Sequence, residues 1–301
     1  MKVAQFLVAR SPADNYWSLV RRLRRRCLGE TSFSEADVLG NWRKYGNPVL
    51  EIDRFARYNR VLRRHTGRSF DPAEFRDRVV LELGCGPVLG ILPLAVFYGA
   101  TAAYYSEPSL SMGLIKGELL RERYFRRLHA ELVAAHEPAR DDFLEFDGFY
   151  EALLEISADL SGAPTDSRLG FVYSNSVLEH IPQNVLPGLL EEVRKRSGAD
   201  CEFLHAVDFS DHRRGKSPFA NIYRHQPPVA RSALSINFCR PSEIRAALED
   251  ASFAPEVIPY RTYEGDLGEV HPDWTKFSDE ELRIGVAFFV SRRTTAGRDV
   301  G

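Results

Sequence analysis

The sequence predicts an α/β protein built on a doubly wound, mostly parallel β-sheet. From Arg78 onward, short apolar segments of strand length alternate with amphipathic segments of helical length, which is the pattern of a parallel sheet covered by helices on both faces. The first apolar segment runs into a turn with two glycines and a proline, residues 84–87, and turns of this kind approach nucleotide-like ligands in such folds. With 301 residues, 44% of them hydrophobic, the chain is long enough for one large core.

The region before Arg78 is expected to be helical. Residues 14–66 have the apolar spacing of three helices separated by two glycine breaks. We therefore predict an N-terminal helical appendage or lid over residues 1–75, followed by a ligand-binding domain over residues 76–301. The arginines of the run RRLRRR, residues 21–26, fall opposite an apolar stripe, so we interpret them as a solvated helix face rather than a site for a polyanion.

Six short apolar runs are predicted to form the strands. They are Val79–Leu83, Ala102–Tyr105, Gly170–Ser174, Glu202–Val207, Glu256–Tyr260 and Gly285–Val290. Two apolar stripes at helical spacing predict helices between them, one over residues 185–193 and one after Pro241, since proline suits the first turn of a helix. A long charged helix over residues 112–136 and a second one over residues 149–156 exceed what a minimal doubly wound domain needs. We interpret residues of about 112–156 as a helical insertion.

Composition excludes several classes of protein. The formal net charge is only −2, with the first part of the chain basic and the rest acidic. The four cysteines are far apart and form no C-x-x-C pair, so neither a disulfide framework nor a zinc knuckle is indicated and we expect reduced thiols. No apolar stretch reaches membrane-spanning length, and the opening residues do not match a signal peptide. We therefore expect a cytoplasmic protein.

The stretch VVLELGCGPVLG, residues 79–90, indicates the kind of ligand. In a strand–turn–helix unit, Gly84 permits the tight turn, and Gly86 lets the backbone approach a ligand without a Cβ in the way. The dinucleotide fingerprint is G-x-G-x-x-G, but here Gly90 comes one residue late. Pro87 also removes a backbone donor where a diphosphate needs one. The turn thus suits a cofactor with a carboxylate and a ribose, which disfavours a nicotinamide-dependent oxidoreductase.

Three segments together resemble the class I S-adenosylmethionine-dependent methyltransferases. The string LELGCGP is similar to their first motif, in which an acidic residue precedes G-x-G. Glu107 ends the second predicted strand 21 residues after Gly86, where an acid can accept hydrogen bonds from both hydroxyls of a ribose. The string FVYSNSVLEHIP, residues 171–182, resembles the family's fourth-strand signature. The resemblance implies a Rossmann-like methyltransferase fold, with S-adenosyl-L-methionine as the cofactor.

The same resemblance implies a set of cofactor-binding residues. In the family, the acidic residue after the second strand binds the ribose, which assigns that role to Glu107, and an acid after the third strand meets the adenine amino group, which assigns that role to Asp159. The chain departs from the family at Val88, where members commonly carry a further glycine. The cofactor-binding set expected here is Glu82, Gly84, Cys85, Gly86, Glu107, Asp159 and Asn175.

Candidate catalytic residues lie after the fourth and fifth predicted strands. The sulfonium group already activates the methyl group, so the protein mainly aligns the donor with the nucleophile, although an alcohol nucleophile benefits from a base. His180 follows the fourth strand, and the string LHAVDFSDH, residues 204–212, ends the fifth with His205 and Asp208. We predict His205, Asp208 and His180 as the catalytic set. For the cluster that continues to Asp211 and His212, a base, a divalent metal ion and a turn stabilised by aspartates all stay open.

No metal site is predicted, because the sequence has no H-E-x-x-H string and no cysteine ligand set. The function favoured by these observations is methyl transfer from S-adenosylmethionine to a small-molecule or carbohydrate-like acceptor, with oxygen as the methylated atom. Two alternatives stay open. A nucleic-acid methyltransferase is disfavoured, since SNSVLEH stands where an N-P-P-Y or D-P-P-Y string is expected. The second alternative is a non-catalytic S-adenosylmethionine-binding or assembly protein.

Overall fold

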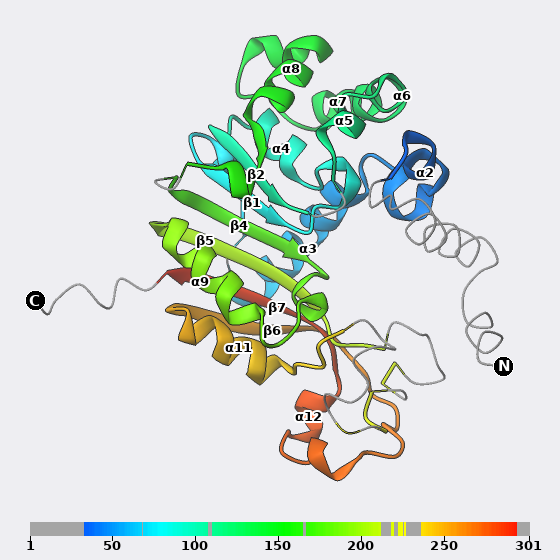
Figure 1. Cartoon of the computed structure of the whole chain (residues 1–301), viewed down its shortest axis with the longest axis vertical. Helices are drawn as coiled ribbons and strands as arrows, with labels where there is room; N and C mark the ends of the chain where they lie inside the picture. Colours follow the sequence, from blue (N-terminus) through cyan, green and yellow to red (C-terminus); the bar gives the residue numbers. More distant parts are fainter. Residues whose placement is uncertain are drawn as a thin grey trace, which may run out of the picture.

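The computed structural model describes residues 33–67, 69–107, 110–164, 167–211, 218–219, 222–224, 226 and 236–293 (Figure 1). The basic run at residues 21–26 and the predicted cluster residue His212 lie outside the described residues. Within the described ranges, none of the helices combines the length and the apolar character needed to cross a membrane.

A seven-stranded sheet forms the centre of the molecule, in the order β3-β2-β1-β4-β5-β7-β6. The strands β1 to β5 pair in parallel, and β7 pairs antiparallel with both β5 and β6. The predicted fold class, a doubly wound and mostly parallel sheet, is therefore confirmed. The strands are β1 (Val79–Leu83), β2 (Ala102–Ser106), β3 (Ser157–Asp159), β4 (Leu169–Asn175), β5 (Ser197–Asp208), β6 (Phe253–Thr262) and β7 (Ile284–Arg293).

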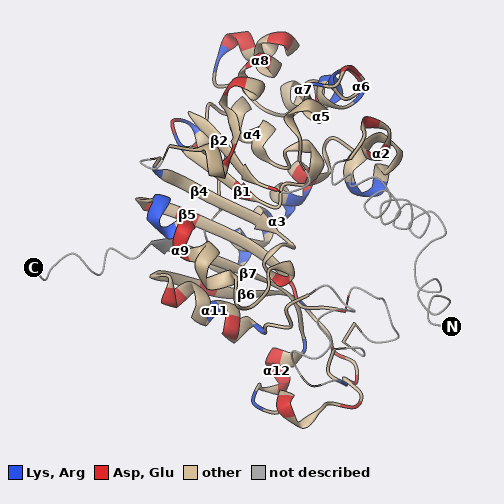
Figure 2. Ribbon diagram, in the orientation of Figure 1, with Lys and Arg blue, Asp and Glu red and all other residues tan. Residues whose placement is uncertain are grey.

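Helices cover both faces of the sheet. Figure 1 shows α9 and α11 on the near face and α3 on the far face, and Figure 2 shows that the strands between them carry few charged residues. The α-helices are α2 (Glu35–Gly40), α3 (Leu50–Thr66), α4 (Leu92–Phe97), α5 (Met112–Ile115), α6 (Glu118–Leu120), α7 (Arg126–Ala135), α8 (Phe146–Ile156), α9 (Leu186–Arg196), α11 (Pro241–Asp250) and α12 (Asp279–Leu282). The buried apolar side chains form one large cluster on each face.

Helix α3 packs directly on the sheet. The ring of Phe55 lies 5.5 Å from that of Tyr173 on β4, and the ring of Tyr58 lies 4.7 Å from that of Phe288 on β7. Ile52, Phe55, Tyr58 and Leu62 belong to the same buried cluster as these strand residues. Residues 50–66 are thus part of the core layer of the sheet, although they fall inside the predicted appendage over residues 1–75. The domain boundary near residue 75 stays a prediction.

The predicted insertion is helical, but its first helix is broken. Instead of one helix over residues 112–136, the chain forms α5, α6, a short π-helix at Arg121–Phe125 and α7. The break comes at Gly117, the N-cap of α6, where the carboxylate of Glu35 accepts a hydrogen bond of 2.7 Å from the Leu120 N–H. A Cβ at residue 117 would lie 2.4 Å from the Glu35 carboxylate. The Arg127 guanidinium also stacks 4.9 Å from the Trp42 ring, so two contacts join the N-terminal segment to the insertion.

Candidate functional site

A cavity of about 900 Å³ opens where β1, β2, β4 and β5 end. This edge of the sheet contains the point where the strand order reverses, between β1 and β4, and open α/β sheets bind their ligands at such points. Helix α3 and the short π-helix η2 (Trp42–Gly46) supply the facing wall. The volume lies near the upper end of the range of about 300–1,000 Å³ that is typical of ligand pockets.

The predicted glycine turn forms one wall of this cavity. Gly84 and Gly86 have φ angles of +69° and +67°, a region that side chains with a Cβ rarely adopt. The Gly84 N–H donates a hydrogen bond of 2.9 Å to the Ser106 carbonyl at the end of β2, and a Cβ on Gly84 would lie 2.3 Å from Val177 Cγ2. The turn therefore requires glycine at this position for both its backbone angle and its packing.

The side chain of Glu82 stabilises the segment that follows the glycine turn. Its side chain is buried and lines the cavity, and Oε2 accepts a hydrogen bond of 2.7 Å from the Ile91 N–H. A Cβ on Gly90 would lie 2.2 Å from this carboxyl group, which explains the third glycine of the stretch. Burial raises the pKa of Glu82 well above its ordinary value. The carboxyl group thus supports the loop that the resemblance assigned to the cofactor.

Glu107 follows β2 directly and meets the glycine turn. Its Oε2 accepts a hydrogen bond of 3.2 Å from the Gly86 N–H, and the side chain lines the cavity. Cys85 also lines the cavity and is buried, and burial raises the pKa of its thiol well above the usual value. The structure therefore brings together five of the predicted cofactor-binding residues at one wall: Glu82, Gly84, Cys85, Gly86 and Glu107.

Asn175, at the end of β4, connects this wall to helix α3. Its Oδ1 accepts a hydrogen bond of 2.9 Å from the Tyr58 hydroxyl, and both residues line the cavity. Burial raises the pKa of Tyr58 to about 12, so the phenol is a hydrogen-bond donor at neutral pH. One turn earlier on the same helix, Arg54 Nη1 lies 2.5 Å from the carboxylate of Glu51, and both side chains line the cavity.

These residues of α3 are functional candidates that the sequence analysis missed. Glu51, Arg54 and Tyr58 stand at positions i, i+3 and i+7, which place them along one side of a helix. A polar stripe that borders an apolar stripe was the available signal. Arg43, Lys44 and Tyr45 of η2, together with Tyr124, Tyr260 and Arg261, also line the cavity without having been predicted.

Asp159 is not among the residues that line the cavity. It ends β3, where Oδ1 accepts hydrogen bonds from the Ser161 N–H at 2.8 Å and the Ser161 hydroxyl at 2.5 Å. This arrangement caps the short turn Leu160–Gly162. The contact with an adenine amino group that the resemblance implies for Asp159 stays a prediction.

The structure places His205 in the core, away from the cavity. The residue is fully buried in the sheet and does not line the cavity. Its Nδ1 lies 2.8 Å from the Ser174 hydroxyl on β4, and burial lowers the pKa of the imidazole to about 4. A general base must reach the proton that it removes, and His205 is not among the residues that line the cavity. The catalytic role expected for His205 stays a prediction.

Asp208 and His180 do line the cavity. Asp208 ends β5, and its Oδ1 accepts hydrogen bonds from the Ser210 N–H at 2.9 Å and the Ser210 hydroxyl at 2.5 Å. His180 is exposed and ends the turn Leu178–His180. Asp211 is buried outside the cavity. Over the described stretches, no group of three histidine, cysteine, aspartate or glutamate side chains has the arrangement to hold a metal ion.

Comparison with known proteins extends the description of the fold. No protein-family model matches the chain, and no curated protein matches it. The solved structures to which it is similar include S-adenosylmethionine-dependent methyltransferases and other methyltransferases.

Three of these structures show the range of similarity. The enzyme from Mesorhizobium loti has 15% sequence identity, a TM-score of 0.39, and coverage of 73% of this chain and 93% of its own. Magnesium protoporphyrin IX methyltransferase from Synechocystis PCC 6803, with bound SAH, has 14% identity, a TM-score of 0.41, and coverage of 92% and 99%. Mitomycin 7-O-methyltransferase has 10% identity, a TM-score of 0.42, and coverage of 94% and 69%. Values this low assign neither a substrate nor a residue role to this chain.

Proposed function

We propose that this protein is a methyltransferase that uses S-adenosyl-L-methionine to methylate an oxygen atom of a small-molecule or carbohydrate-like acceptor in the cytoplasm. The observation that carries the proposal is the contact between Glu107 and Gly86 at the wall of the cavity. It joins the acidic residue after β2 to the glycine turn after β1, which are two of the segments that carry the resemblance to the family.

The residues present fit the proposed cofactor. The turn at Gly84 and Gly86 gives a ligand access to the backbone, and the Glu107 carboxylate faces the same cavity with acceptor capacity for ribose hydroxyls. Asn175 and Glu82 complete this half of the cavity. When bound, the cofactor supplies a methyl group that its sulfonium already activates. The protein has to hold donor and acceptor in line and exclude water.

The remaining walls suit an acceptor. The end of β5 brings Asp208 to the cavity, and His180 lies at the turn after β4. Asp208 and His180 are the two predicted catalytic residues that reach it, and either can take the proton of an acceptor hydroxyl. Tyr58 of α3 and the residues Arg43, Lys44 and Tyr45 of η2 line the opposite side of the cavity.

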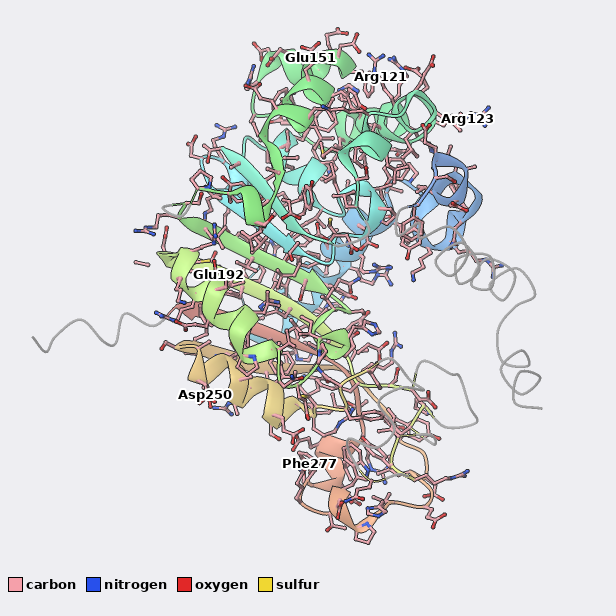
Figure 3. The ribbon with its side chains drawn as sticks, in the orientation of Figure 1. Arg121, Arg123, Glu151, Glu192, Asp250 and Phe277 are labelled. Carbon is pink, nitrogen blue, oxygen red and sulfur yellow. The ribbon has the colours of Figure 1, made fainter. Side chains whose placement is uncertain are left out.

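Calorimetric titration with S-adenosylmethionine, S-adenosylhomocysteine and NADH tests the proposal. We expect one-to-one binding of the first two compounds and none of NADH. Replacing Glu107 by alanine should weaken binding by about 1–3 kcal/mol, because the ribose hydroxyls would lose their acceptor. The matched control is Glu151→Ala: Glu151 lies on α8 at the outer end of the insertion, outside the cavity lining (Figure 3). Equal affinities of the two variants would remove Glu107 from the site.

A further inference from the structure

Strand β6 carries a bulge where it reaches the cavity. Pro259 pairs with Ala287 of β7, but the next pair is Arg261 with Val286, so Tyr260 is an extra residue on the β6 side. In a regular strand, consecutive side chains point to opposite faces of the sheet. Here Tyr260 and Arg261 both line the cavity. Bulges redirect side chains in this way and are enriched next to active sites.

The bulge also builds an aromatic wall. The ring of Tyr260 lies 5.6 Å from that of Tyr58 and 4.8 Å from that of Phe288. Tyr58 is in turn fixed by its hydrogen bond to Asn175 at the end of β4. Tyr260 and Phe288 belong to β6 and β7, at one edge of the sheet, whereas Glu107 follows β2 near the other edge. The aromatic wall therefore lies away from Glu107, on the side that the proposed function leaves to the acceptor.

The charges that line the cavity leave Arg261 available for a ligand. Each lining carboxylate already takes part in an ion pair or a hydrogen bond: Glu51, Glu82, Glu107 and Asp208. Arg54 is paired with Glu51. Arg261 is exposed and has no ion pair with any carboxylate in the described ranges. Arg43 and Lys44, which also line the cavity, add positive potential that attracts anions.

We propose that Arg261 binds an anionic group of the methyl acceptor, a carboxylate or a phosphate, while the rings of Tyr58 and Tyr260 pack against the acceptor's carbon skeleton. The inference rests on the proposed function, since it names the acceptor class of the same cavity. The planar guanidinium matches the two oxygens of either group with two parallel N–H···O bonds. Arg261 is thus a specificity-determining residue that selects acidic acceptors over neutral ones of the same shape.

Three small aromatic probes test this inference: benzoate, phenyl phosphate and the neutral benzamide. Their affinities are measured by ligand-observed NMR, with and without saturating S-adenosylhomocysteine. We expect at least one of the two anions to bind at least tenfold more tightly than benzamide, and the ratio between the anions tells which group the site prefers. Equal affinity of both anions and benzamide would overturn the inference.

Variants of Arg261 show whether that residue carries the selection. In Arg261→Gln, the affinity for the anions should fall roughly ten- to hundredfold while the affinity for benzamide stays constant. Arg261→Lys should have an intermediate anion affinity, because lysine keeps the positive charge but lacks the two parallel N–H donors of the guanidinium. The matched control is Arg245→Gln on α11, an exposed arginine whose partner is Glu249; it should bind all probes like the parent. Unchanged anion affinity in Arg261→Gln would refute the role of Arg261.

Titration of S-adenosylhomocysteine on the same samples separates this inference from the proposed function. If the cofactor product binds and the anions do not, the acceptor class is wrong and the methyltransferase proposal stands. If the anions bind selectively and the cofactor product does not, the anion site stands and the methyltransferase proposal fails. Because Arg261 is exposed, its variants should keep the parent's thermal unfolding midpoint, which confirms that a loss of binding is local.

Discussion

Replacing Gly84 by alanine should destabilise the protein for two separable reasons. At a φ of +69°, a residue with a Cβ costs about 1–2 kcal/mol in backbone strain. The new Cβ would also lie 2.3 Å from Val177 Cγ2, and overpacking of this kind costs about 1–3 kcal/mol. We therefore expect the free energy of unfolding to fall by about 2–5 kcal/mol, measured by urea denaturation followed by circular dichroism.

Two further variants separate the backbone cost from the packing cost. Gly67 has nearly the same φ, +70°, but nothing lies within 4 Å of the position that a Cβ would take there, so Gly67→Ala should show the backbone cost alone. The double variant Gly84→Ala with Val177→Ala removes the clash and should regain part of the loss, as a favourable coupling in a double-mutant cycle. If Gly84→Ala costs no more than Gly67→Ala, the packing of Val177 against the glycine turn is not the constraint described above.

Two other predictions concern buried polar groups. His205 has a pKa of about 4 in the folded protein against an ordinary value of 6.5, so its contribution to stability is complete above pH 6.5 and is lost as the pH falls toward 4. As the pH falls, the parent should therefore lose about 3 kcal/mol of unfolding free energy that His205→Gln does not lose. Identical pH profiles of the unfolding free energy in the two proteins would contradict the burial argument. Tyr58→Phe should lower the free energy of unfolding by about 0.5–1.5 kcal/mol, because the hydroxyl bonds to Asn175. The control Tyr173→Phe removes a buried hydroxyl that has no hydrogen-bond partner in the described part of the chain and should be neutral or stabilising; a larger loss there than at Tyr58 would refute the comparison.

The sequence predicted most of the sheet because six of its strands contain a short run that is mainly apolar. The exception is β3, Ser157–Asp159, which has three residues and is too short for any periodicity to show. The long helix expected over residues 112–136 is divided because Glu35, more than eighty residues earlier in the chain, binds the N–H of Leu120. A contact between segments so far apart leaves no signal in the local pattern.

The candidate site shows the same division between local and distant information. The glycine turn and Glu107 were predictable, since both lie directly after a strand and their spacing is set by one strand–turn–helix unit. Tyr58 and Arg261 reach the cavity only through the packing of α3 on the sheet and the bulge in β6. The burial of His205 could not be predicted, because strand alternation gives the face on which a residue lies but not which layers cover that face.

The contact between Glu35 and the insertion also limits how this protein can evolve. Because the Glu35 carboxylate occupies the space beside Gly117, a larger residue at position 117 has to displace this carboxylate from its hydrogen bond with the Leu120 N–H. A shorter side chain at position 35 would remove the clash. The two positions are therefore expected to vary together among descendants of this chain, although they belong to segments that are separate in sequence. Substitutions at this junction between the N-terminal segment and the insertion would then arise in pairs.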